Sequence, residues 1–286
     1  MTRLSINKTY KLYIGGKFPR TESGRYYAIN NKKGDLIANM CLASRKDFRN
    51  AVVIARKAQS SWASVSALNK GQILYRIAEM LEGRKEQFIA ELILQGETKS
   101  NAQKEVEASI DRLVYYAGWS DKYQQLFSSV NPVSSPHFNF SNVEPAGVTA
   151  IIAPEEQSLL GLVSQIAPAI VGGNTVIALA GESKPLTSIS FAEVLNSSDV
   201  PGGVVNILTG NKNELIEHMA SHMDVNSLIY CGKNKDEMKL ISDLASLNVK
   251  RTVFYKKTDW STDNSQSPYF IEKLQEVKTT WHPVKV

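Results

Sequence analysis

Cysteine is scarce in this sequence, and long apolar runs are absent. The two cysteines, Cys41 and Cys231, cannot form a disulfide framework and lack the spacing of metal ligands, which fits a reducing compartment. No stretch approaches the roughly 18 apolar residues needed to cross a bilayer, and residues 1–16 lack the apolar core of a signal peptide. We therefore expect a cytoplasmic protein with no membrane partner.

Charge of one sign is not concentrated along the chain either. The 33 Lys and Arg against 28 Asp and Glu leave a net charge of +5. The short basic cluster of Lys250, Arg251, Lys256 and Lys257 surrounds a predicted strand. Nucleic-acid-binding surfaces combine clustered basic residues with a recognition motif, and we find no basic stripe interleaved with aromatics. We therefore expect no nucleic-acid partner.

Metal-ligand patterns are limited to one pair of histidines. His218 and His222 lie four residues apart on a predicted helix, a spacing that can bind zinc. Met219 stands where the zinc motif has its catalytic Glu, and no third ligand is apparent. His137 and His282 are isolated in the sequence. The sequence therefore predicts no metal site.

The 286 residues, 43% of them hydrophobic, suffice for one large or two ordinary domains. Residues 10–14 predict a strand that enters a turn at Gly15 and Gly16, and residues 26–30 and 35–40 predict two further strands. Ser44, with Asp47 three residues later, has the pattern of a capping box at a helix start. Apolar residues at helical spacing then predict a run of helices up to Ala117.

After a Ser- and Pro-rich stretch at residues 126–136, which predicts a linker, apolar strands alternate with helices. This alternation is typical of a parallel sheet buried on both faces and predicts a doubly wound α/β domain, which commonly binds ligands at its carboxyl edge. The predicted strands are 148–153, 175–179, 204–208, 227–230 and 251–255, and the predicted helices are 159–171, 186–195, 213–220 and 237–247. A polar loop at 256–268 and an extended stretch at 277–281 complete the pattern.

Four segments carry a family resemblance over nearly the whole chain. EPAGVTAIIAPEEQSLLGLVSQIAPAIVGGNTVIALAGESKPLT at residues 144–187 and PGGVVNILTG at residues 201–210 resemble the cofactor domain of aldehyde dehydrogenases. YIGGKF at residues 13–18 and EVKT at residues 276–279 match as well. The chain is most similar to the shortened second module of the two-module family 16 aldehyde dehydrogenases.

The resemblance implies both a fold and a division of the chain. The fold is α/β, with a doubly wound, mostly parallel sheet of cofactor-domain type, N-terminal helices, a small antiparallel oligomerisation sheet and no catalytic domain. The expected parts are an N-terminal helical part (1–125), an oligomerisation hairpin (126–145), a Rossmann-like cofactor-type domain (146–256), and a loop with a C-terminal strand (257–286).

The resemblance also implies that the catalytic positions are altered. Where the family has Pro-Trp-Asn, whose Asn donates to the developing oxyanion, this chain has Pro154, Glu155 and Glu156. A carboxylate at 156 would repel the negative charge that the Asn stabilises. Tyr255 stands at the position of the general-base Glu, and a neutral phenol is a poor base at pH 7. Neither cysteine aligns with the family's nucleophile, so we expect no catalytic residues in this chain.

The cofactor positions are partly retained. Leu179 replaces the family's ribose-binding Lys, whereas the ribose-binding Glu is present as Glu182, and the alternative is that Glu182 is simply a solvated loop carboxylate. Gly232 keeps the turn of the family's Gly-Ser pair. Lys233 after it has three interpretations: it attracts phosphate at the helix N-terminus, it fills the cofactor site, or it is simply solvated. We expect NAD(P) to bind weakly or not at all. The candidate cofactor-binding residues are Pro154, Glu182, Gly210, Gly232 and Lys233.

The C-terminal strand returns in family-like form. In the family, a hairpin before the cofactor domain and the last strand form a small sheet that carries oligomerisation. Here the hairpin would lie near residues 126–133 and 137–143, and the last strand would place Val277, Thr279 and Trp281 on one face. We expect this sheet to bind a second copy or an aldehyde dehydrogenase catalytic unit, unless the strand merely completes the chain's own sheet.

Three functions stay open on the sequence alone. The first is a catalytically inactive interaction or oligomerisation module, which Glu156, Leu179 and Tyr255 favour. The second is a subunit or fragment of an NAD(P)-dependent aldehyde dehydrogenase that needs a partner's catalytic domain. The third is a nucleotide-sensing module that uses Glu182 and Lys233.

Overall fold

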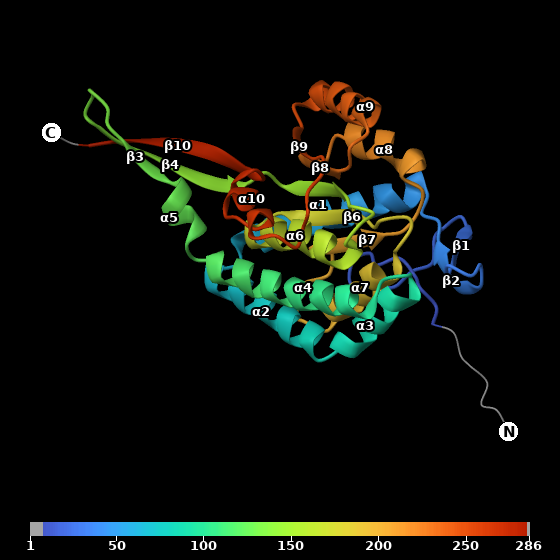
Figure 1. The fold of residues 1–286 in the computed structure, drawn as a ribbon. Helices are drawn as coiled ribbons and strands as arrows, with labels where there is room; N and C mark the ends of the chain where they lie inside the picture. Colours follow the sequence, from blue (N-terminus) through green and yellow to red (C-terminus); the bar gives the residue numbers. More distant parts are fainter. Residues whose placement is uncertain (1–7, 285–286) are drawn as a thin grey trace.

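The computed structural model describes residues 8–284, and a parallel five-stranded sheet lies at its centre (Figure 1). Residues 1–7, on which part of the signal-peptide expectation rests, and residues 285–286 lie outside the described residues. The strand order β7-β6-β5-β8-β9 is that of a doubly wound sheet, so the predicted fold class is confirmed. The strands are β5 (Val148–Ile152), β6 (Thr175–Leu179), β7 (Val205–Leu208), β8 (Ser227–Cys231) and β9 (Arg251–Tyr255).

Alternate side chains of the sheet enter two separate cores, because successive residues of a strand point to opposite faces. In β5, Ala150 and Ile152 join one core and Ile151 joins the other. One face is covered by α1 (Arg45–Ser64), α8 (Lys212–Ser221) and α9 (Lys235–Ala245), and the other by α6 (Ser158–Val171) and α7 (Leu186–Asn196). An outer layer of α2 (Ala67–Glu82), α3 (Lys85–Leu94) and α4 (Lys99–Trp119) packs on α6 and α7.

The N-terminal segment matches the predicted elements with one correction. Ser44 and Asp47 form the predicted capping box of α1, and β1 (Tyr26–Asn30) and β2 (Leu36–Cys41) form a hairpin. The strand predicted at residues 10–14 is wrong, since this segment makes only isolated bridges. The segment crosses the edge of β7 at a single residue, where Tyr13 and Ile207 exchange two backbone hydrogen bonds. No helix within residues 8–284 has the length and apolarity to span a bilayer.

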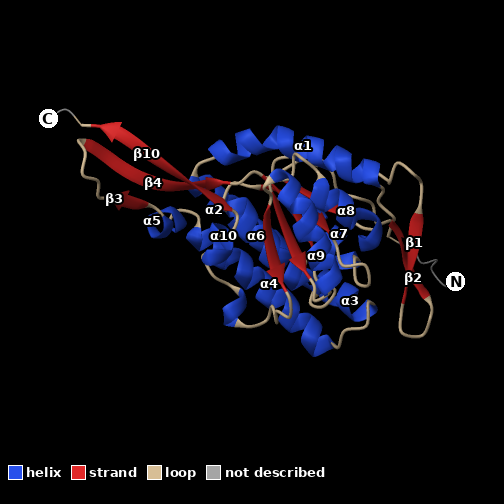
Figure 2. Cartoon of the chain, turned by 90° about the horizontal axis from the view of Figure 1, so that it is seen from above, coloured by secondary structure: helices blue, strands red, loops and turns tan. Residues whose placement is uncertain are grey.

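A second, antiparallel sheet projects from the body and ends near the C-terminus (Figure 2). It has the order β10-β4-β3, with β3 (Ser129–Asn131), β4 (His137–Pro145) and β10 (Gln275–Pro283), and we call it the arm. The linker predicted at residues 126–136 therefore contains a strand, and the end of α5 (Tyr123–Phe127) precedes it. The small antiparallel sheet predicted from the family resemblance is present.

Residues 256–274 connect β9 to β10, and we call them the connecting segment. They contain a short 3-10 turn, η2 (Asp263–Ser265), and one helical turn, α10 (Tyr269–Glu272). The polar loop predicted at 256–268 is not simply solvated, because Trp260 is only 2% exposed. The buried Arg112 of α4 donates hydrogen bonds to the carbonyl oxygens of Trp260 (2.8 Å) and Ser265 (2.7 Å) and to the Ser164 hydroxyl (2.5 Å). These bonds fix the segment against α4 and α6.

Replacing this guanidinium should destabilise the fold. Arg112→Ala leaves two buried carbonyl groups and a buried hydroxyl without their donor, and we expect the free energy of unfolding to fall by about 3 kcal/mol. Urea denaturation followed by circular dichroism measures the change. Arg76→Ala is the matched control, because Arg76 only pairs with Glu79 on the exposed face of α2. Equal unfolding midpoints for the two variants would contradict the role given to Arg112.

Candidate functional site

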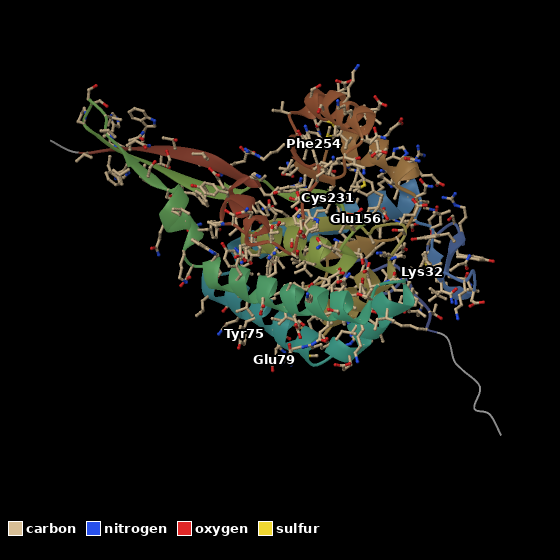
Figure 3. All side chains as sticks on the ribbon, viewed as in Figure 1. Lys32, Tyr75, Glu79, Glu156, Cys231 and Phe254 are labelled. Carbon is tan, nitrogen blue, oxygen red and sulfur yellow. The ribbon has the colours of Figure 1, made fainter. Side chains whose placement is uncertain are left out.

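The candidate site lies at the carboxyl ends of the parallel strands. The crossover helices leave β5 toward one face of the sheet and approach β8 from the other, so a crevice is expected between these two strand ends. Residues 153–156 come directly after β5 and residues 232–233 directly after β8, and the two strands are paired neighbours. Glu156 and Cys231 accordingly lie in the same region of the molecule (Figure 3). The structure therefore brings the sequence-predicted residues to one edge.

Glu155 ties the end of β5 to the loop after β6. Its carboxylate accepts hydrogen bonds from the backbone N–H groups of Glu182 (2.9 Å) and Ser183 (3.0 Å) and from the Ser183 hydroxyl (2.6 Å). Both Glu155 and the adjacent Glu156 are exposed, and Glu156 makes none of these contacts. Sequence reasoning missed this role of Glu155, since two of its three partners are backbone groups that carry no signal in the sequence.

The position of the expected ribose contact is closed off. Leu179 is only 2% exposed and belongs to the same core as Ile152 and Leu208, so its side chain is not presented to a ligand. The side chain of Glu182 is half-buried. Burial, followed by the charges of Glu182 and Glu155, raises the pKa of Tyr27, whose buried hydroxyl has no hydrogen-bond partner within the described residues. This edge therefore presents negative charge.

Pro154 and the two candidate glycines each serve the packing of the chain itself. Pro154 is buried against α6, where a side chain at Gly161 would collide with it. A Cβ atom at Gly210 would lie 3.0 Å from the backbone nitrogen of Ala43. A Cβ atom at Gly232 would collide with the ring of Tyr230. Close packing alone accounts for these positions, and a cofactor role for them stays a prediction.

The backbone donors at the start of α9 are already engaged. The Asn234 side chain accepts hydrogen bonds from the N–H groups of Asp236 (2.9 Å) and Glu237 (3.3 Å). The carboxylate of Glu237 in turn accepts a hydrogen bond from the Tyr230 hydroxyl and pairs with Lys212 at 2.7 Å. A helix N-terminus attracts anions through free N–H groups. Here the Asn234 side chain already engages two of these N–H groups, and the Glu237 carboxylate already supplies a negative charge beside them. Lys233 beside it is exposed.

Tyr255, at the position of the family's base, packs against the connecting segment and is half-buried. Its ring centroid lies 5.4 Å from that of Trp260 and 5.2 Å from that of Phe270, and the Lys273 ammonium lies 5.0 Å from its centre. Burial raises the pKa of Tyr255. The phenol is therefore neutral near pH 7 and cannot accept a proton as a base.

The indole of Trp260 also covers the start of α6. A Cβ atom at Gly161 would lie 3.1 Å from this ring, so the absence of a side chain there makes room for it. Gln157 anchors the same stretch, because its side chain accepts a hydrogen bond from the backbone N–H of Trp260 (2.7 Å) and donates one to the Asp259 side chain (3.0 Å). The chain's own residues therefore fill the space beside Tyr255 and Pro154.

Neither cysteine is placed as an activated nucleophile. Cys231 is half-buried at the end of β8, and burial raises the pKa of its thiol. Cys41 is buried, and its thiol contacts the carbonyl oxygen of Tyr10 at 3.7 Å. A thiol reacts only through its thiolate, which the raised pKa of Cys231 disfavours.

The histidine pair lies outside the strand edge. His222 comes directly after α8 and accepts a hydrogen bond from the Asp224 N–H (3.2 Å) while its ring meets that of Phe48 edge-on. Burial lowers the pKa of His222, so its neutral form is favoured. Within residues 8–284, no three His, Cys, Asp or Glu side chains come together in a way that could hold a metal ion.

A surface groove lies well away from this edge. It has a volume of about 550 Å³ and runs between α2 and α4, with Leu68, Tyr75 and Val114 among its walls. Figure 3 shows Tyr75 and Glu79, which line it, far from Cys231 and Glu156. The groove and the strand edge are therefore separate features.

Comparison with known proteins gives consistent relatives. Residues 18–255 match the model of the aldehyde dehydrogenase family. Cytosolic 10-formyltetrahydrofolate dehydrogenase of Mus musculus is 31% identical over 255 residues, which are 87% of this chain and 28% of that protein. The structure of PnpE from Pseudomonas sp. WBC-3 has a TM-score of 0.83 at 26% identity. The match covers 87% of this chain and 51% of the PnpE chain. An NAD⁺ complex of aldehyde dehydrogenase from Bacillus cereus has a TM-score of 0.82 at 25% identity, with 86% and 50% covered.

The chain thus spans about half the length of these solved dehydrogenase chains and 28% of the first relative. The likeness to the second module of family 16 is not tested by these relatives and stays an interpretation. The assignment to the family rests on sequence and fold together. The matched residues run from just after the Gly15–Gly16 turn to the last strand of the parallel sheet. The chain belongs to the aldehyde dehydrogenase family.

Proposed function

We propose that this chain does not oxidise aldehydes by itself and acts as an association module of the aldehyde dehydrogenase family. The observation that carries the proposal is the connecting segment. It leads from β9 to the arm through residues 256–274 and packs Trp260 against the ring of Tyr255 on the way. This segment is therefore a structural bridge to the arm, and it contains no cysteine that could serve as the nucleophile.

NAD(P) is the cofactor that the family implies, and the residues at the strand edge fit it poorly. The N–H groups of the loop after β6 hold Glu155, and two of those at the start of α9 hold Asn234. Leu179 supplies no charge and is buried. We therefore propose that NAD(P) binds this chain weakly or not at all.

The arm supplies the association surface in this proposal. Strand β10 is an edge strand, so one side of its backbone has no partner within the described residues. Val277 and Trp281, two residues of the predicted face, are 64% and 57% exposed. Val130 and Phe138 add further exposed apolar side chains to the arm. A projecting sheet with an open edge and exposed apolar side chains is suited to a second copy or to the catalytic unit of a relative.

The isolated chain should form no NADH from aldehydes. The reason is that burial raises the pKa of Tyr255 and of the Cys231 thiol, while Cys41 is buried. Absorbance at the NADH band, recorded with a panel of aliphatic and aromatic aldehydes, measures this. NADH formation that disappears on Cys231→Ser would refute the proposal. Activity that arises only after a family relative is added would favour the subunit alternative.

The thiol of Cys231 should resist alkylation in the folded protein. Because burial raises its pKa, the thiolate fraction at pH 7.5 is small. Mass spectrometry after a timed iodoacetamide pulse should find little adduct in the native chain and two adducts in urea, one for each cysteine. Cys231 labelling as fast as free cysteine at the same pH is the result that would count against a buried, inert thiol.

Polar substitution of the arm face should break the association. Val277→Ser with Trp281→Ser removes apolar burial of roughly 3 to 5 kcal/mol before the cost of binding is counted, so association should weaken at least about a hundredfold. Light scattering of the full chain, alone and with its co-purified partners, measures the mass. Tyr26→Ser with Leu36→Ser on the β1–β2 hairpin is the control, since these residues are equally exposed but lie off the arm.

An unchanged mass and unchanged partners in the arm variant would overturn the association proposal. A truncation is a less clean test if it begins too early. Leu274 is only 1% exposed, and the Gln275 side chain donates to the carbonyl oxygen of Gly172 at 3.1 Å. Removal of the strand should therefore begin at Val277, so that the body of the molecule keeps these contacts.

A further inference from the structure

Helix α1 carries charge of almost one sign. Its 20 residues include five basic side chains and a single acidic one, Asp47. Asp47 is buried and accepts hydrogen bonds from the backbone N–H of Ser44 (2.9 Å) and from the Thr21 hydroxyl (2.6 Å), so its carboxylate serves the start of the helix. The exposed face of α1 therefore carries positive charge and no negative charge.

Three of the basic side chains form a row with one apolar residue. Arg45, Arg49, Val53 and Lys57 follow one another at intervals of four residues, so they lie on one side of the helix, about 6 Å apart along its axis. All four side chains are exposed, and we call them the basic row. Figure 2 shows α1 along the outer margin of the body. The row thus lies on an element that neither the arm nor the strand edge uses.

The chain supplies no counter-charge for the basic row. None of its three cations pairs with an acid within residues 8–284, whereas Lys46 beside them pairs with Glu22 at 3.0 Å. The neighbouring helix α8 carries two exposed acids. Glu214 pairs with Arg25 at 2.7 Å, and Glu217 pairs with no cation among the described residues. The cations of the row are therefore available to an anion from outside.

The placement of these cations does not favour the helix itself. Positive charge in the first turns opposes the helix dipole, and Arg45 and Arg49 repel each other at a spacing of four residues. The capping box and the apolar contacts of Phe48, Val52 and Ala55 on the opposite face hold α1 without them. A partner that brings carboxylates to the row relieves both penalties.

We propose that the basic row is a docking surface for an acidic helix of a partner protein. The partner presents carboxylates to Arg45, Arg49 and Lys57, and an apolar side chain between them packs on Val53. A helix matches this spacing because its own side chains repeat at the same interval. Guanidinium groups suit carboxylates, which they bind through two parallel hydrogen bonds.

Val53 decides the class of partner. It is 59% exposed at the centre of the row, with Arg49 on one side and Lys57 on the other. A nucleic-acid backbone offers phosphates with no apolar group between them. A helix that lies in a membrane interface needs several large apolar side chains, and Val53 is the one large apolar residue that α1 exposes. An acidic protein helix with an apolar centre therefore fits the row best.

The test titrates the ¹⁵N-labelled full chain with synthetic helical peptides. The acidic peptide carries Glu on both sides of a central Leu at four-residue intervals, so that either chain direction matches the row. The control peptide has Lys in place of Glu. The amide signals of residues 45–57 should shift and saturate with the acidic peptide alone, and the affinity should fall as salt is added, because exposed charges are screened.

Charge reversal separates the row from the net charge of the chain. Arg45→Glu with Arg49→Glu should weaken peptide binding at least about tenfold, since two attractions become repulsions. The variant should stay folded by circular dichroism, because acidic residues favour the first turns of a helix. Lys235→Glu with Lys239→Glu is the matched control. These exposed lysines are the first and fifth residues of α9, as Arg45 and Arg49 are of α1, so this variant should bind as the unaltered chain does.

Any of three results would overturn the proposal. The first is an absence of saturable shifts in the unaltered chain. The second is an equal loss of binding in the α1 and α9 variants, which would assign the effect to net charge alone. The third is tighter binding of duplex RNA or of phosphatidylserine vesicles with the same dependence on Arg45 and Arg49, which would assign the row to another class of partner.

The apolar centre has its own variant. Val53→Ser should weaken binding of the acidic peptide about threefold, because the Leu of the peptide loses its apolar contact. An unchanged affinity would contradict the choice of a protein partner. The arm variant Val277→Ser with Trp281→Ser should bind the peptide as the unaltered chain does, so a failure of the association proposal leaves this result unaffected.

Discussion

The hydrogen bonds of the buried Arg112 guanidinium are the interaction on which the connecting segment, and through it the arm, depends. The guanidinium sits between α4 and α6 and donates to two carbonyl oxygens of the connecting segment, at Trp260 and Ser265. These bonds hold an otherwise irregular stretch in one conformation, because a buried carbonyl without a donor is costly. From there the chain continues through α10 to the base of the arm. One buried charge thus sets the route from the parallel sheet to the antiparallel one.

At the carboxyl edge of the sheet, side chains of the chain itself bind the donors and fill the space that a ligand would use. Doubly wound sheets offer free N–H groups and open space at this edge, which is why ligands collect there. In this chain Glu155 takes the donors after β6, Asn234 takes two donors at α9, and Trp260 fills the space beside Tyr255. Each replacement is local and uses a different kind of contact. Together they leave a family fold whose usual binding edge is occupied by its own side chains.

The sequence predicted the regular parts of the fold closely, because apolar periodicity and capping are local signals. The strands at 175–179 and 251–255 begin and end where predicted, and Ser44 caps α1 with Asp47. The segment at residues 10–14 was mispredicted, since a single crossing of β7 does not make a ladder. Apolar composition alone cannot tell a paired strand from an extended chain that packs.

The candidate site was predictable in its location and not in its contacts. The motifs placed Glu156, Glu182, Gly232 and Tyr255 at one edge, and the strand order brings them there. The role of Glu155 could not be read, because its partners are mainly backbone groups of a loop 27 residues away. The ring contacts of Tyr255 were equally hidden, since Trp260 comes from a segment whose composition is that of a solvated loop. Long-range contacts to backbone atoms leave no pattern in composition or spacing.

The pairing of β4 with β10 has a consequence for the order of events during synthesis. Ser141 and Thr279, whose hydroxyls hydrogen bond across the arm at 2.8 Å, are 138 residues apart in the chain. Contacts of such long sequence separation form late, because the loop between them must be closed first. Until β10 is available, the side of β4 that pairs with it has no partner, and such edges invite wrong pairings. The arm is thus completed only when β10 emerges, and the same strand start, at Gln275, also completes the packing of the body against Gly172.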